Sequence, residues 1–188
     1  NAGGYLLQEM WMTLTQTTDN VKCQKQIIEK LKERFPDNYQ TLLDLYEDKY
    51  WTKTDFDNCS EMGMNVIRLP FWYMNLLDEN YNLKDNAFDR IDWFVSEAGK
   101  RGMYVILDMH GVPGSQNGQE HSGDTSMGVG FFQGDKAFSY QQIAIDLWKK
   151  IAEHYNNNPI VAGYDLLNEP YTSETVQRTT KTVWDYYD

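Results

Sequence analysis

The feature that most constrains this chain is a series of short apolar runs, each followed by a helical pattern. Three runs are continuously apolar, at residues 66–70, 103–109 and 160–167, and a weaker one lies at residues 5–7. Continuous rather than alternating hydrophobicity is typical of strands in a parallel sheet that is covered on both faces. We therefore expect four buried parallel strands, the second of them ending at Pro70.

The helical patterns are recognised by apolar residues that recur at spacings of three and four. They lie at residues 54–59, 88–98, 140–155 and 173–187. Residues 18–47 add a further helical pattern that is broken at Pro36, and we interpret residues 12–50 or so as a helical insertion after the first strand. A strand followed by a helix, four times over, predicts an α/β fold with a parallel sheet and right-handed crossovers.

Charge and composition exclude several classes of partner. The chain has 17 Lys and Arg against 28 Asp and Glu, a net charge of −11, which disfavours nucleic acid and anionic membrane surfaces as partners. No apolar run is long enough to span a bilayer, and no signal-peptide pattern is visible in the first residues. The many aromatic side chains favour a neutral ligand such as a sugar, on whose ring faces they can stack.

The two cysteines, Cys23 and Cys59, form neither a disulfide framework nor a metal cluster. We expect two free thiols, with a single bridge between them as the alternative in an oxidising compartment. The three histidines lack the spacing of a zinc protease.

Polar residues collect where the apolar runs end. Arg68 lies inside the second run, Asp108 and His110 end the third, and Asn168 and Glu169 follow the fourth. In parallel α/β folds functional side chains gather at the carboxyl ends of strands. A partly desolvated carboxyl such as Glu169 can have its pKa raised enough to act as a general acid, as glycoside hydrolysis requires. The alternative is a structural ion pair of Arg68 with Glu169 or Asp108.

These residues resemble glycoside hydrolase family 5, the cellulase family. The resemblance rests on Leu-Leu-Asn-Glu-Pro at 166–170 and Asn-Val-Ile-Arg-Leu-Pro at 65–70. The stretch from Leu107 to Gly123 is similar to the third-strand loop of fungal exo-β-1,3-glucanases in that family, and residues 3–11 are similar to their first-strand segment.

The resemblance implies roles for five residues. Glu169 matches the general acid/base, and Asn168 matches the residue that hydrogen-bonds the sugar 2-hydroxyl. Arg68 and His110 match the residues that surround the catalytic carboxylates, and Glu9 matches a sugar-binding carboxylate.

The resemblance also implies an eight-stranded barrel of about 250 residues or more. Residues 1–188 then form a single (β/α)4 half-barrel catalytic domain, half of a (β/α)8 TIM barrel, completed by a homodimer or by a second half. The family's nucleophile is a second Glu at the end of the seventh strand, and no residue of this chain matches it. Glu9 or Glu120 would have to serve if the chain alone is active. Trp11, Trp72 and Tyr171 are candidate stacking platforms for sugar rings.

The predicted function is hydrolysis of β-glucosidic bonds in cellulose-type or related β-glucans. Endo-cleavage of β-1,4-glucan ranks first, because it is the commonest activity in the wider family. The alternatives are an exo-β-1,3-glucanase and a non-catalytic, sugar-binding half barrel. The resemblance implies secretion, and it implies no metal and no organic cofactor.

Overall fold

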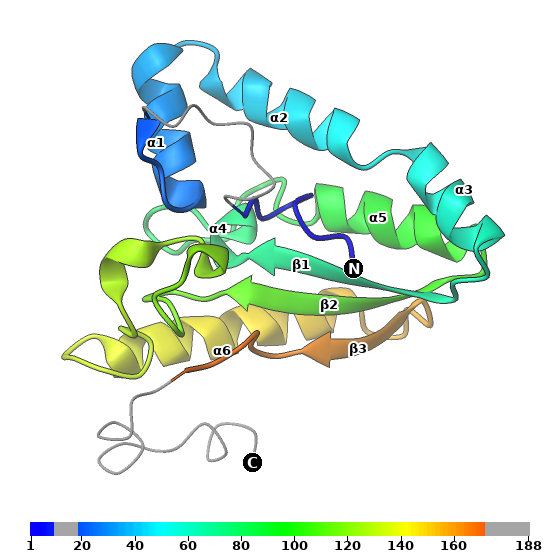
Figure 1. The fold of residues 1–188 in the computed structure, drawn as a ribbon. Coiled ribbons are helices and arrows are strands. Elements are labelled where there is room, and N and C mark those ends of the chain that lie inside the picture. The colour runs from blue at the N-terminus through cyan, green and yellow to red at the C-terminus, as the bar shows by residue number, and fades with distance from the viewer. Residues whose placement is uncertain (10–18, 172–188) are drawn as a thin grey trace.

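The computed structural model describes residues 1–9 and 19–171 of the chain. The predicted last helix and Trp11 lie outside these residues. The helices and strands are, in chain order, α1 (Gln24–Arg34), α2 (Tyr39–Tyr50), α3 (Lys53–Glu61), β1 (Val66–Trp72), α4 (Tyr73–Leu76), α5 (Asp89–Gly99), β2 (Tyr104–Gly111), the 3-10 helices η2 (Glu120–Ser122) and η3 (Thr125–Met127), α6 (Ala137–His154) and β3 (Val161–Asp165) (Figure 1).

The three strands form one parallel sheet in the order β1-β2-β3. They confirm three of the four predicted strands and the parallel topology. The register places Pro70 beside Asp108, and Asp108 beside Asp165, so the polar strand ends lie level with one another. Pro70 does not end β1 as expected. It lies inside the strand, which an edge strand permits because not every backbone N–H of an edge strand is needed by a neighbour.

The predicted first strand, residues 5–7, is not a strand. Tyr5, Leu6 and Leu7 are almost fully buried, so the apolar run does enter the core. Gly4 has a φ of +84°, and the amide of Tyr5 bonds back to the carbonyl of Ala2, which bends the chain. Ala2 donates a backbone hydrogen bond to Arg68 of β1 at 2.8 Å, so the segment lies along the sheet edge in a turn conformation.

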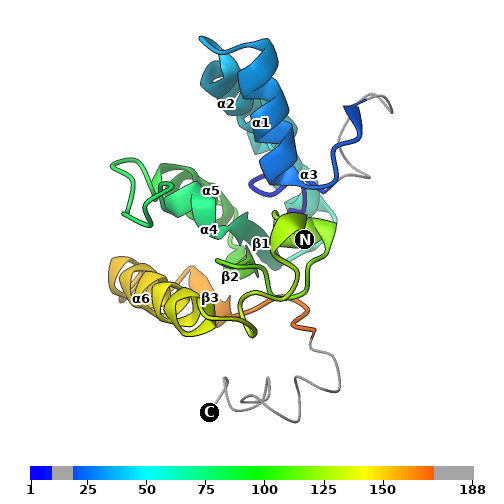
Figure 2. The same ribbon diagram turned by 90° about the vertical axis from the view of Figure 1, so that its left-hand side faces the viewer.

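The sheet carries helices α5 and α6 on the same side (Figure 2). A right-handed crossover fixes the side on which each connecting helix lies, and strands that are added in one direction therefore keep all their helices on one face. This one-sided arrangement is typical of a barrel wall and differs from a doubly wound sheet, which has helices on both faces. The described residues therefore form part of a (β/α) barrel.

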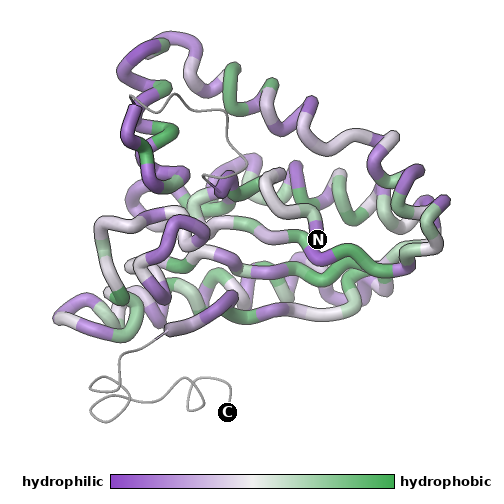
Figure 3. The backbone as a smooth tube through the Cα atoms, viewed as in Figure 1, coloured by the Kyte–Doolittle hydropathy of each residue, from purple (hydrophilic) through white to green (hydrophobic). Residues whose placement is uncertain are grey.

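The core is aromatic at one end of the sheet. Phe56 of α3 is fully buried and contacts the rings of Trp51, Trp93 and Phe94 at centroid distances of 5.7, 5.7 and 4.7 Å. Hydrophobic residues follow the strands, whereas the turn between α1 and α2 is hydrophilic (Figure 3). The Phe56 cluster joins α3 to α5.

The described part of the predicted insertion contains two helices, and the break predicted at Pro36 is confirmed, because α1 ends at Arg34 and α2 begins at Tyr39. Two phenol groups hold α2 to the start of the chain. Tyr46 donates to the carbonyl of Gly4 at 2.6 Å, and Tyr50 donates to the carbonyl of Gly3 at 3.0 Å.

Both cysteines are free thiols, as expected. In the part of the chain that the structure describes, no helix is both long enough and apolar enough to cross a bilayer.

Candidate active site

The carboxyl ends of the strands bring five polar side chains into one cluster. Arg68 comes from β1, Asp108 and His110 from β2, Asp165 from the end of β3, and Asn168 from the segment that follows. Arg68 of β1 pairs with Ile106 of β2, and His110 lies four residues further along β2. Every second side chain of a strand projects to the same face, so Arg68 and His110 share one face of the sheet. We call this group the strand-end cluster.

Arg68 organises the cluster because its guanidinium meets three oxygen acceptors. Nε and Nη2 donate to Oδ2 of Asp165 at 3.0 and 2.8 Å, and Nη2 also donates to Oδ1 of Asn168 at 2.9 Å. The same Nη2 lies 3.0 Å from Oδ2 of Asp108. Of the two partners considered from the sequence, Asp108 is therefore confirmed, and Glu169 is not paired with Arg68. Sequence reasoning did not find Asp165, because its position within the fourth apolar run hid its polar role.

Asp108 fixes the state of His110. Its Oδ2 lies 2.6 Å from His110 Nδ1, and because a carboxylate only accepts, Nδ1 carries the hydrogen. Nε2 of His110 is then an acceptor, and it faces Nδ2 of Asn168 at 3.2 Å. Asp108 is fully buried, and this burial raises its pKa even though His110 and Arg68 act in the opposite direction. Its second oxygen, Oδ1, is buried without a hydrogen-bond partner among the described residues.

Asn168 is held at both ends of its side-chain amide. Its oxygen accepts from Arg68 and one of its amide hydrogens points to His110. Among the described residues the second amide hydrogen has no acceptor, and a sugar hydroxyl is an acceptor of the right kind. The network therefore orients Asn168 while leaving it one donor.

Glu169 is placed differently from the expectation. Its side chain is 72% exposed, so the prediction of a partly desolvated carboxyl is wrong for this structure. Glu169 lies beyond the end of β3 and has a φ of +42°, in the left-handed region. The carboxylate lies 3.4 Å from Nε2 of His121, beside a pocket of about 340 Å³ that Tyr171 also lines.

The loop after β2 supplies two residues that the sequence reasoning missed. Gln116 and Asn117 lie in a stretch rich in Gly, Ser and Gln, and polar loops of this kind are usually solvated. Both side chains are nevertheless buried, and both hydrogen-bond the segment that carries Glu169. The neighbouring residues Ser115 and Gly118 have positive φ, which indicates a loop with a defined conformation. Such dihedral angles cannot be read from the sequence.

Three further candidates from the sequence are Glu9, Trp72 and Tyr171. Glu9 lies close enough to Tyr50 of α2 to contribute, after burial, to the raised pKa of that phenol. Its role in sugar binding stays a prediction. Trp72 is buried with 2% of its surface exposed, so it cannot serve as a stacking platform here, whereas Tyr171 is 65% exposed.

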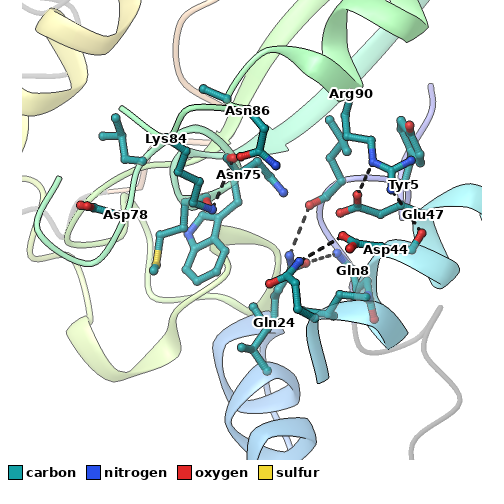
Figure 4. A pocket seen from close by; sticks show the side chains of 18 of the residues that line it. Tyr5, Gln8, Gln24, Asp44, Glu47, Asn75, Asp78, Lys84, Asn86 and Arg90 are labelled. Carbon is teal, nitrogen blue, oxygen red and sulfur yellow. Dashed lines mark hydrogen bonds and ion pairs between the residues drawn. The ribbon is translucent and has the colours of Figure 1, made fainter. Parts of the chain in front are cut away.

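A second cavity of about 300 Å³ lies between α1, α2 and the segment from α4 to α5 (Figure 4). Its polar lining includes Gln8, Gln24, Glu47 and Arg90, and none of the strand-end cluster lines it. No group of three or more His, Cys, Asp or Glu that could hold a metal ion occurs within residues 1–9 and 19–171.

A barrel wall with its helices on one side, and a polar cluster at the carboxyl ends of its strands, are the features of the (β/α)-barrel class of enzymes. The cellulase model, glycosyl hydrolase family 5, matches residues 37–188. The chain therefore belongs to glycosyl hydrolase family 5.

Curated relatives and solved structures are similar to this chain over part of their length. A β-xylosidase of Phanerodontia chrysosporium is 36% identical over 129 residues, which are 68% of this chain and 26% of the relative. A probable glucan 1,3-β-glucosidase A of Neosartorya fischeri is 30% identical over 195 residues, covering 100% of this chain and 44% of the relative. The chain thus spans less than half the length of these relatives.

Rutinosidase from Aspergillus niger shares the fold. Its crystal structure matches with a TM-score of 0.72 at 21% identity, covering 92% of this chain and 48% of that one. At this identity the match supports the architecture and nothing finer.

Proposed function

We propose that this chain is part of a glycoside hydrolase that cleaves β-glucosidic bonds of glucans, with Glu169 as the proton donor. The observation that carries the proposal is the position of Glu169. It directly follows Asn168, whose side chain is bonded to Arg68 and His110 at the carboxyl end of the sheet. We also propose that residues 1–188 act as one half-barrel catalytic domain with a helical insertion at about 12–50.

Glycoside hydrolysis needs two carboxyl groups, a proton donor, which is the role of Glu169, and a nucleophile. The leaving alkoxide must be protonated as the glycosidic bond breaks, and retaining enzymes place a nucleophilic carboxylate about 5–5.5 Å from the donor. The exposed carboxyl of Glu169 borders an open pocket, where a leaving group can reach it. A carboxylate from a later strand of the barrel is our first candidate for the nucleophile, and Glu9 and Glu120 are the candidates within this chain.

The substrate is proposed as a β-linked glucan. The sequence ranks endo-cleavage of β-1,4-glucan first, whereas the relative from Neosartorya fischeri is named a glucan 1,3-β-glucosidase, which favours the exo-β-1,3 alternative. Reducing-sugar release from carboxymethylcellulose, lichenan and laminarin separates the two. Release from laminarin as glucose alone supports the exo-β-1,3 alternative, and oligosaccharides from carboxymethylcellulose support the endo-β-1,4 one.

Glu169→Gln tests the assignment of the proton donor. Turnover on unactivated glucan should fall about 100-fold or more, because the amide of glutamine is too weak an acid to protonate the leaving oxygen. Glu61→Gln, at an exposed position of α3, is the matched control and should leave turnover unchanged. A Glu169→Gln variant that folds normally and retains full turnover would remove the proposal.

A non-catalytic, sugar-binding role is the second candidate. The observation in its favour is that Glu169 is exposed rather than enclosed with a second carboxylate. Binding of laminarin without release of reducing sugar, by protein whose circular dichroism spectrum is that of a folded chain, would establish it.

We propose that further strands complete the barrel, either from a second half or from a second copy of the chain. β1 and β3 are the edges of the described sheet, and unpaired strand edges invite association. Light scattering tests the second copy, since a homodimer doubles the 22.1 kDa mass of the chain. We also propose that the protein is secreted and that it binds neither nucleic acid nor membranes.

A further inference from the structure

We infer that Gln116 and Asn117 are positioning residues for Glu169, and that together they hold the backbone on which its carboxyl is mounted. The inference rests on the proposed role of Glu169 as proton donor. It assigns a task to two buried amides of the loop after β2, which neither the family resemblance nor the comparisons give them.

Gln116 ties the ends of two strands together. Its side chain is fully buried, and Nε2 donates to the carbonyl of His110 at 2.7 Å and to the carbonyl of Asn168 at 2.9 Å. An amide nitrogen carries two hydrogens, so both are used. One side chain therefore sets the separation between the end of β2 and the segment that follows β3.

Asn117 holds the next residue along. Its Nδ2 donates to the carbonyl of Glu169 at 3.0 Å and lies 2.7 Å from Nε2 of His121. Its Oδ1 accepts from the amide of Gln119 at 2.9 Å, which fixes the orientation of the side-chain amide. Nε2 of His121 is then the acceptor of the second hydrogen, so Asn117 also holds the imidazole that lies beside the carboxylate.

A third bond closes the arrangement from the other direction. The amide of Tyr171 donates to the backbone carbonyl of Gln116 at 3.3 Å. The carbonyls of residues 168 and 169 and the amide of residue 171 are thus all bound by two consecutive loop residues.

Glu169 needs such support because of its backbone conformation. A φ of +42° lies in the left-handed region, which non-glycine residues adopt at a cost in free energy. Conformations of this kind persist where the surroundings determine them, and they cluster at functional sites. Released from the loop, residue 169 would relax to negative φ, and its carboxyl would point in a different direction.

The test uses Asn117→Ala, because Asn117 contacts Glu169 directly and is less central to the fold than Gln116. Gln133→Ala is the matched control, since Gln133 is an exposed amide in the same loop. The ratio kcat/KM, which reports only the steps up to cleavage of the glycosidic bond, is measured on two β-glucosides, one with a phenyl leaving group and one with a dinitrophenyl leaving group. Phenolate is a poor leaving group that needs a proton from the enzyme, and dinitrophenolate leaves without one.

We expect Asn117→Ala to lose about 10- to 100-fold on the phenyl glucoside and less than about threefold on the dinitrophenyl glucoside. Gln133→Ala should change neither rate. An equal loss on both glucosides would overturn the inference, because a merely structural defect does not depend on the leaving group.

A second readout keeps the inference independent of the proposed function. A completed barrel of wild-type sequence that hydrolyses neither the glucosides nor the glucans refutes the proposed function. Hydrogen exchange at the amide of Tyr171 then tests the loop by itself. Asn117→Ala should speed this exchange about 10-fold or more relative to Gln133→Ala, and unchanged exchange would overturn the inference.

Discussion

Replacing Glu47 by Gln should make the stability of the protein less sensitive to pH. Glu47 lies on α2, where its side chain is 20% exposed and its Oε2 is 2.9 Å from Nε of Arg90 on α5. Arg90 is also paired with Asp48 (Figure 4 shows the position of Arg90 beside Glu47). Burial raises the pKa of Glu47 to about 7, with Arg90 lowering it and Asp44 and Asp48 raising it.

The sign and the magnitude follow from linkage. The folded protein binds this proton more tightly than the unfolded chain, whose carboxyl has the usual pKa of 4.5. The contribution of Glu47 to the free energy of unfolding is therefore largest below pH 4.5 and is lost as the pH rises through 7. A difference of about 2.5 in pKa, at 1.36 kcal/mol for each pH unit, gives a loss of about 3 kcal/mol.

The assay is urea denaturation followed by circular dichroism at pH 5, 6, 7 and 8. Wild type should lose about 2–3 kcal/mol across this range relative to Glu47→Gln, because glutamine does not titrate. Glu61→Gln, at an exposed position of α3, should keep the wild-type slope. If wild type and Glu47→Gln differ by the same amount at every pH, Glu47 does not titrate in this range and the reasoning is refuted.

Three other substitutions, one of them with a matched control, test the core, the loop packing and the strand-end cluster. Phe56→Ala should lower the free energy of unfolding by about 3–5 kcal/mol, measured in urea, because it empties the centre of a cluster of aromatic rings. Gly111→Ala should destabilise the fold, since its Cβ would lie 2.3 Å from the carbonyl oxygen of Ser122, whereas Gly163→Ala meets nothing within 4 Å and should be nearly neutral in the same thermal melt. Asp108→Asn should lower turnover on glucan about 10-fold or more with unchanged circular dichroism, because the new amide no longer fixes the hydrogen on the neighbouring histidine. Full turnover in that variant would show that the pair has no part in the reaction.

The sequence predicted the sheet where apolar runs were long. The runs at 66–70, 103–109 and 160–167 are each at least five residues long, and all three contain strands. The run at residues 5–7 is equally well buried but is not a strand. Three apolar residues predict burial and do not determine a backbone conformation, which here is bent at Gly4.

The candidate site was predictable where polar residues lie within or directly after the predicted strands. Arg68, His110 and Asn168 were found in this way, and the structure brings all three together. The exposure of Glu169 was not predictable, because a carboxyl that follows a strand can be either enclosed or solvated and the sequence does not distinguish the two. Gln116 was missed for a related reason, since a fully buried glutamine and a solvated one have the same appearance in a sequence.

The bonds that Gln116 makes have an evolutionary consequence. They end on the backbone carbonyls of His110 and Asn168, not on their side chains. Every amino acid has such a carbonyl, so the tie would survive the exchange of either side chain. Selection can therefore change the chemistry at these two positions without first rebuilding the scaffold that presents them. A lineage in which either side chain changes can in this way keep the end of β2 and the segment that follows β3 in the same arrangement.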